Sequence, residues 1–81
     1  MTLNWTTTSA YADQHFLITP SDDDLLQDGL VILANGEGTI TIADKVGTEI
    51  TYNVLAGQII PVVAYKVLET GTTVDSIVGL L

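Results

Sequence analysis

Residues 30–42, LVILANGEGTITI, decide the fold class of this chain. The run at 30–34 is apolar throughout, and it is closed by Asn35-Gly36, a strong signal for a tight turn. Residues 39–42 then alternate between threonine and isoleucine, as a half-buried strand does. Two strand-like runs joined by such a turn are typical of a β-hairpin. The stretch therefore predicts antiparallel β-structure.

Strand signals continue on both sides of this hairpin. Residues 14–19 form a candidate first strand that Pro20 ends, and residues 49–54 alternate again. Residues 58–68 and 73–81 complete the set. Turn signals separate the runs at intervals of roughly 8–12 residues, so we expect a meander of hairpins. The pattern predicts an all-β fold, a small antiparallel β-sandwich or barrel of about six to seven short strands.

The 81 residues leave room for one domain. Residues 1–13 are interpreted as an extended N-terminal arm, and residues 14–81 as the single β domain. The arm is small and polar except for Trp5 and Tyr11. Aromatic anchors of this kind often dock onto a partner, because they bury much area at little cost in entropy. Folding of the arm back onto its own core is an equal alternative.

The run at residues 58–68 is apolar on both faces. A strand of this kind is covered on both sides, and in so small a domain we expect a neighbouring subunit to be the second cover. Pro61 cannot donate to a ladder, which predicts an edge, a bulge or a strand start there. Residues 77–81 are too apolar to lie free in water. The candidate interface residues, with the two aromatic residues of the arm, are Trp5, Tyr11, Ile59, Pro61, Val63, Tyr65, Ile77, Val78, Leu80 and Leu81.

The charge of the chain is strongly one-sided. Ten acidic residues stand against two lysines, for a net charge of −8. Such a surface repels nucleic-acid phosphate and anionic lipid, so no nucleic-acid or membrane partner is expected. It favours a basic protein partner or serves solubility. The N-terminus lacks the basic start and apolar run of a signal peptide, which predicts a soluble protein made in the cytoplasm.

No constellation in the sequence predicts catalysis, a cofactor or a metal. Cysteine is absent and His15 is the single histidine, so thiolate sites and the usual zinc sites are not expected. The acidic run at 22–28 begins either a short helical turn or a loop, and its spacing does not match a calcium-binding loop. A solvated loop or a contact with a basic partner is favoured there over a metal site. Gly36-Glu37-Gly38 precedes no helix, so it is interpreted as a hairpin turn and not as a phosphate loop.

A succession of short motifs resembles a family of small phage-type virion proteins, which includes the head-spike base protein of gene transfer agents. Their order along the chain carries the resemblance, since none of them is a catalytic signature. The chain departs from the family at residues 62–66, where family members tend to be basic. The matching stretches are FLITPSD at 16–22, GEGT at 36–39, VLAG at 54–57 with IP at 60–61, and ETGTTVDSIVGL at 69–80.

The resemblance implies a capsid decoration (cement) protein or a vertex spike-base protein without enzyme activity. Such a protein would bind the outer surface of the major capsid protein as a homo-oligomer, trimer or pentamer, with a spike or fibre protein as a further partner. It would be made in the host cytoplasm and reside on the virion, at the capsid surface. The alternative is a carbohydrate- or receptor-binding module of a phage tail or fibre, in which Tyr52, Tyr65 or Trp5 stacks on a sugar.

Overall fold

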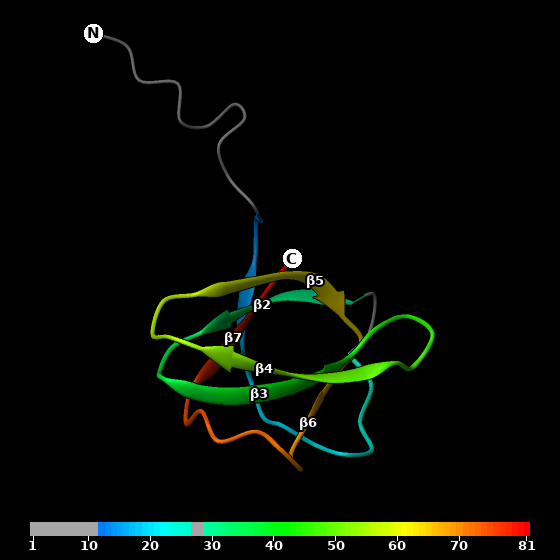
Figure 1. The fold of residues 1–81 in the computed structure, drawn as a ribbon. Coiled ribbons are helices and arrows are strands. Elements are labelled where there is room, and N and C mark those ends of the chain that lie inside the picture. Colours follow the sequence, from blue (N-terminus) through cyan, green and yellow to red (C-terminus); the bar gives the residue numbers. More distant parts are fainter. Residues whose placement is uncertain (1–11, 27–28) are drawn as a thin grey trace, which may run out of the picture.

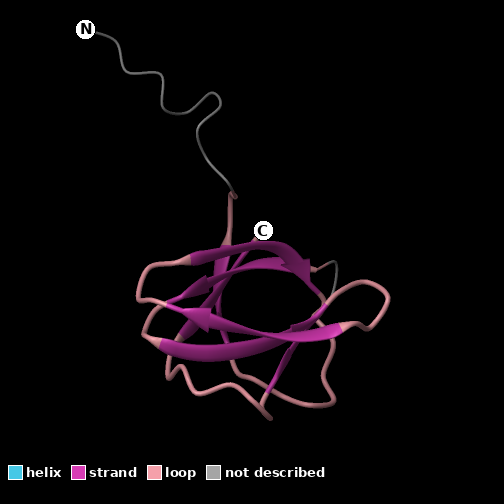
Figure 2. Ribbon diagram, in the orientation of Figure 1, coloured by secondary structure: helices cyan, strands magenta, loops and turns pink. Residues whose placement is uncertain are grey.

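Two antiparallel β-sheets packed face to face form the domain in the computed structural model, which describes residues 12–26 and 29–81 (Figure 1). Loops alone connect the strands in this part of the chain (Figure 2). The predicted all-β sandwich is therefore confirmed. Its strands are β1 (His15–Ile18), β2 (Leu30–Ala34), β3 (Gly38–Ala43), β4 (Glu49–Val54), β5 (Ile59–Ala64), β6 (Lys66–Leu68) and β7 (Ile77–Leu80).

The larger sheet has the strand order β1-β7-β2-β5, and the smaller one has the order β4-β3-β6. The first and last strands lie side by side in the larger sheet, with Ile18 opposite Ile77 and His15 opposite Leu80. Within residues 12–26 and 29–81, no helix is long and apolar enough to cross a membrane.

The prediction of a hairpin at residues 30–42 is wrong in its pairing. β2 pairs with β5 and β7, whereas β3 pairs with β4 and β6, so the turn at Asn35-Gly36 leads from one sheet into the other. The backbone N–H of Asn35 donates to the carbonyl of Ser76, 2.9 Å away, and this bond joins the turn to the residue just before β7. β2 is apolar on both of its faces, whereas β3 alternates between polar and apolar residues. The two strands therefore suit two sheets whose outer sides differ in polarity. The meander is retained between β3 and β4.

The predicted single strand at residues 58–68 is also wrong, because the chain changes sheets within it. β5 ends at Ala64 in the larger sheet, Tyr65 forms a bend, and β6 continues in the smaller sheet. The N–H of Tyr65 donates to the carbonyl of Ala43 at 2.8 Å and so starts the new pairing. The expected irregularity at Pro61 is confirmed, since the register between β2 and β5 shifts there and β5 is an edge strand.

One further segment differs from expectation, and in another the structure selects between two predicted alternatives. The last strand is shorter than residues 73–81, because the chain first runs beside β3, where the N–H of Thr73 donates to the carbonyl of Thr39 at 2.8 Å. The acidic run contains no helical turn over residues 21–26. The Ser21 hydroxyl accepts the N–H groups of Asp23 and Asp24, each at 3.2 Å, and thereby holds a loop.

The hydrophobic core lies between the two sheets. Its largest fully buried side chains come from strands of both sheets, and each stabilises the fold by roughly 1.5–3 kcal/mol relative to an exposed position. These side chains are Ile32, Ile40, Ile60, Ile77 and Val67.

Candidate interaction surface

The strand registers place two rows of side chains across the outside of the larger sheet. Alternation in β2 buries Leu30, Ile32 and Ala34, which leaves Val31 and Leu33 on the outer side together with their cross-strand partners. One row is Leu17–Val78–Leu33–Ile59 and the other is His15–Leu80–Val31–Val63. We call these eight residues, with the exposed Pro61 on β5, the outer apolar face.

The outer apolar face is exposed most at its two edges. Leu17 on β1 retains 80% of its surface and Val63 on β5 retains 47%, while Val31 and Leu33 between them are half-buried. Because the inner side of the same sheet forms the core, this sheet is apolar on both sides. Contiguous exposed apolar surface of this kind marks an interaction site.

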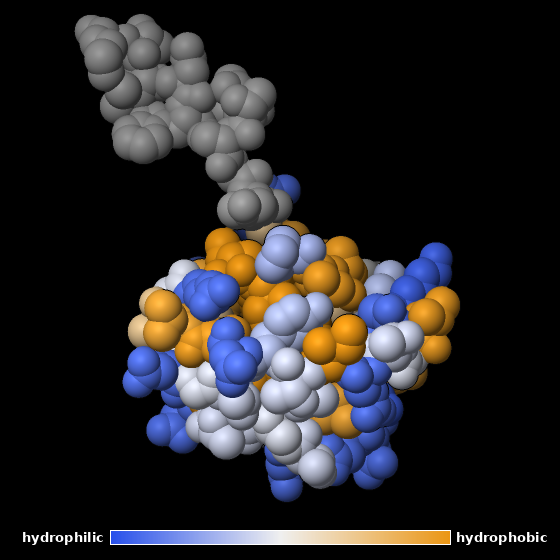
Figure 3. Space-filling model, in the orientation of Figure 1, coloured by the Kyte–Doolittle hydropathy of each residue, from blue (hydrophilic) through white to orange (hydrophobic). Residues whose placement is uncertain are grey.

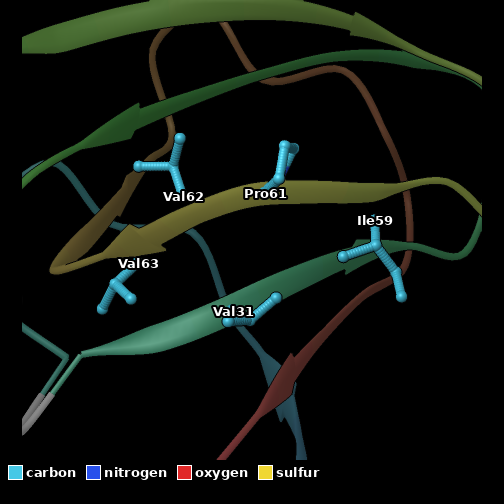
Figure 4. A pocket seen from close by; sticks show the side chains of 5 residues that line it. All are labelled: Val31, Ile59, Pro61, Val62 and Val63. Atoms are coloured by element: carbon cyan, nitrogen blue, oxygen red, sulfur yellow. The ribbon is translucent and has the colours of Figure 1, made fainter. Parts of the chain in front are cut away.

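Two hollows lie at opposite edges of this face. One, of about 330 Å³, is lined by Val31 of β2 and by Ile59, Pro61, Val62 and Val63 of β5 (Figure 4). The other, of about 320 Å³, is lined by residues of β1 and by Val78 of β7. Each can receive a bulky apolar side chain from a docked partner.

The outside of the smaller sheet is polar, in contrast. The hydroxyls of Thr41 and Thr51 lie 2.6 Å apart across β3 and β4, and the Thr39 hydroxyl donates to the carbonyl of Gly71 at 2.8 Å. Figure 3 shows pale and blue residues over β3 and β4, with orange residues towards β5. The two sheets therefore present different surfaces, and the larger one is suited to protein contact.

Charged side chains lie around the outer apolar face and not on it. Among the described residues, no acidic side chain belongs to either row, and His15 is the one ionisable group in them. Asp22 lies in the loop after β1, where its carboxylate accepts the N–H of Thr70 at 2.9 Å and the Thr70 hydroxyl at 2.7 Å. These two bonds lower the pKa of Asp22 below its ordinary value. Within the described part of the chain, no group of three or more His, Asp or Glu residues could hold a metal ion.

The structure divides the predicted interface residues into four groups. Ile59, Pro61, Val63, Val78 and Leu80 lie on the outer apolar face, and Leu81 follows it with 48% of its surface exposed. Ile77 must be corrected, because it faces inward and is 1% exposed in the domain's own core. Tyr65 is half-buried at the bend after β5, where its ring packs against Gly29. Trp5 and Tyr11 lie outside the described residues.

Sequence reasoning missed Leu17, Val31 and Leu33. The signal for the latter two was present, since the unbroken apolar run of β2 puts apolar side chains on both faces. Leu17 could not be assigned a face, because the pairing of β1 with β7 joins residues about sixty positions apart.

A small all-β domain with one polar and one apolar outer sheet is suited to packing against other protein surfaces. No family model matches the chain, and no curated protein matches it. Among solved structures, the chain is similar to a chain from the capsid of a native GTA (gene transfer agent) particle computed with C5 symmetry. The identity is 34%, the match covers 95% of this chain and 96% of that one, and the TM-score is 0.80. The chain therefore belongs to the family of this GTA capsid protein, a family of capsid-associated structural proteins.

Proposed function

We propose that the protein attaches to the outer surface of the major capsid protein as a homo-oligomer, in the role of a capsid decoration or vertex spike-base protein. One observation carries the proposal: the likeness to a GTA capsid chain extends over 95% of this chain, at 34% identity. The homo-oligomer would be a pentamer at a five-fold vertex or a trimer elsewhere on the capsid.

The outer apolar face supports a role in assembly. It is about 19 Å wide, at roughly 4.8 Å for each of the four strands, and apart from His15 it is lined by apolar side chains. Each aliphatic side chain that becomes fully buried contributes about 1.5–3 kcal/mol to association. In a particle, many copies add such contacts, and no chemical step is required of any of them.

The distribution of charge suggests that contacts between copies and contacts with the capsid use different surfaces of the domain. Because the acidic side chains lie outside the rows, the face of one copy can approach another copy without burying a carboxylate. The acidic loops remain at the periphery and are available to a basic surface of the capsid. The proposed location is the outside of the capsid.

Add-back to particles tests this function. Particles assembled without the protein would be mixed with the purified chain and sedimented. We expect the protein to co-sediment, to saturate, and to appear as rings at the vertices in electron micrographs. Saturation at a copy number above that of the vertices, with the protein spread over the whole capsid, would indicate a decoration protein and not a vertex spike base. Absence from sedimented particles at saturating concentration contradicts both roles.

A glycan-binding module of a tail or fibre is the second candidate, and one hollow favours it. This hollow, of about 350 Å³, is lined by Tyr65 and Leu25 together with both lysines, Lys45 and Lys66. It combines an aromatic ring with charged groups, as a sugar site requires. Tyr52 does not contribute a platform, because it packs against the core. Binding of the isolated domain on a glycan array, lost in Tyr65→Ala, would support this candidate. Co-sedimentation with capsids and no glycan binding would exclude it.

A further inference from the structure

The outer apolar face has no cover among residues 12–26 and 29–81. Both rows are completed by strands of the same sheet, and no other described element crosses them. An uncharged and largely apolar occupant suits it best, because a partner's ammonium group would be buried there without a counterion and a carboxylate would find only His15 within the two rows.

The chain enters the domain at the margin of this face. An oxygen of Leu81 accepts the N–H groups of Asp13 at 2.8 Å and Gln14 at 3.0 Å, and the N–H of Leu81 donates to the carbonyl of Gln14 at 2.9 Å. These bonds extend the pairing of β1 with β7 by one more position (Figure 1). The described chain bends at Asp13, next to this extended pairing, so the N-terminal segment joins the domain at this end of the sheet.

The sequence before β1 has few signals for a tight reversal, namely Asn4, Ser9 and Asp13. Residues 1–19 contain neither glycine nor proline, the residues that most often make tight turns. A tight return over the face of the same copy is therefore less favoured than packing on a neighbouring copy, which needs no such turn.

The chemistry of residues 1–11 matches the outer apolar face. They contain no charged side chain, although the chain as a whole carries a net charge of −8. Met1, Leu3 and Trp5 occupy alternate positions, with polar residues between them, which is the pattern of a strand with one apolar side. A strand of this kind can lay that side on an apolar sheet.

The dimensions also agree. Residues 1–11 reach up to about 36 Å when extended, at about 3.3 Å per residue, whereas the face is about 19 Å wide. The hollow of about 330 Å³ beside Val63 can take the indole of Trp5, and tryptophan is a frequent anchor in such hollows.

We propose that residues 1–11 of one copy pack on the outer apolar face of a neighbouring copy, with Trp5 in the hollow at β5. The inference rests on the homo-oligomer of the proposed function and names the segment that holds it together. The arm then joins copies to one another, and the capsid is contacted by other surfaces.

Cross-linking of the full chain tests whether residues 1–11 of one copy lie on the face of another copy. Because the sequence contains no cysteine, only the introduced cysteines react. One tagged copy would carry Thr6→Cys and a differently tagged copy would carry Val63→Cys, and the mixture would be treated with a short bismaleimide. We expect a cross-link between the two tags. The matched control replaces Val63→Cys by Asn53→Cys, an exposed position on the polar sheet, and should give no such product.

A chain with both Thr6→Cys and Val63→Cys distinguishes exchange from folding back. Products that join two chains support the proposal. A cross-link within one chain, equal linking to Asn53→Cys, or no product at all overturns it.

Trp5→Ala provides an independent readout of the same contact. We expect association of the purified protein to weaken on the order of thirtyfold, with the thermal unfolding of the diluted domain unchanged. The control Thr8→Ala should associate normally, and normal association of Trp5→Ala overturns the role of Trp5. Add-back to particles is scored separately. Cross-linked copies that fail to bind particles would refute the proposed function and leave arm exchange standing, whereas particle binding without cross-links would do the reverse.

Discussion

The substitution Leu17→Ser tests whether association depends on the outer apolar face itself or on exposed apolar residues anywhere on the domain. Leu17 is 80% exposed in the domain, so the substitution removes few contacts within one copy. Surface changes of this kind usually alter the free energy of unfolding by less than about 0.5 kcal/mol. The matched control is Val46→Ser in the turn between β3 and β4, where the side chain is 85% exposed and lies far from the two rows.

The expected effect on association follows from this exposure. Full burial of a leucine side chain contributes about 1.5–3 kcal/mol, so the exposed four-fifths of Leu17 contributes about 2 kcal/mol when a partner covers it. At about 1.4 kcal/mol for each factor of ten, Leu17→Ser should weaken association about thirtyfold. Val46→Ser should leave it unchanged.

Sedimentation velocity over a concentration series measures the association, and thermal unfolding at high dilution reports on the domain alone. Equal association of Leu17→Ser and the unsubstituted protein would refute the assignment of this face to an interface. Equal weakening by Val46→Ser would refute it too, because the effect would then reflect general hydrophobicity.

Three further predictions concern the fold. Ile32→Ala should lower the free energy of unfolding by about 2–5 kcal/mol in denaturant titration, because Ile32 is fully buried and the substitution leaves a cavity. Gly71→Ala should cost more than Gly47→Ala: both glycines have positive φ, +90° and +93°, but only at Gly71 would the new methyl group meet a neighbouring side chain. Asp22→Asn should destabilise the domain near neutral pH. Because its hydrogen bonds to Thr70 lower the pKa of Asp22 below 3.8, the stability that they provide is present above that pH and is lost as the pH falls through the lowered value.

Each of these has a result that would contradict it. A loss from Ile32→Ala no larger than that from Val46→Ser would place Ile32 outside the core. Equal melting temperatures for the two glycine variants would show that the positive φ alone sets the cost, with no contribution from the contact of the new methyl group at Gly71. For Asp22, the stability difference between the unsubstituted protein and Asp22→Asn should narrow as acid is added, and a difference that is constant down to pH 2 would contradict the link to Thr70.

The local part of the fold could be predicted from the sequence, and the pairing could not. Alternation at residues 39–42 and 49–54 identified β3 and β4, which are also neighbours in space. The turn at Asn35-Gly36 was recognised as a turn, but a turn dipeptide does not say whether the chain stays in its sheet. That choice depends on distant partners, namely β7 for β2 and β6 for β3.

For the candidate surface, the sequence identified the apolar segments but not the face on which each of their side chains lies. The apolar residues of β5 and the C-terminus were visible as excess hydrophobicity, and five of them lie on the outer apolar face. Ile77 and Val78 could not be separated by composition, because adjacent residues of a strand point to opposite faces. Only the register of β7 shows that Ile77 belongs to the core and Val78 to the outside.

The irregular edge at Pro61 has a consequence for how large an assembly can become. Open-ended polymerisation by strand addition requires two compatible edges on each sheet, so that every added molecule offers a new site for the next. β5 presents a proline and a shifted register at one edge of the larger sheet, which leaves the four residues of β1 at the other. Strand addition through β1 alone ends after two molecules. The larger sheet can thus remain exposed at high concentration without supporting open-ended strand addition through its own edges.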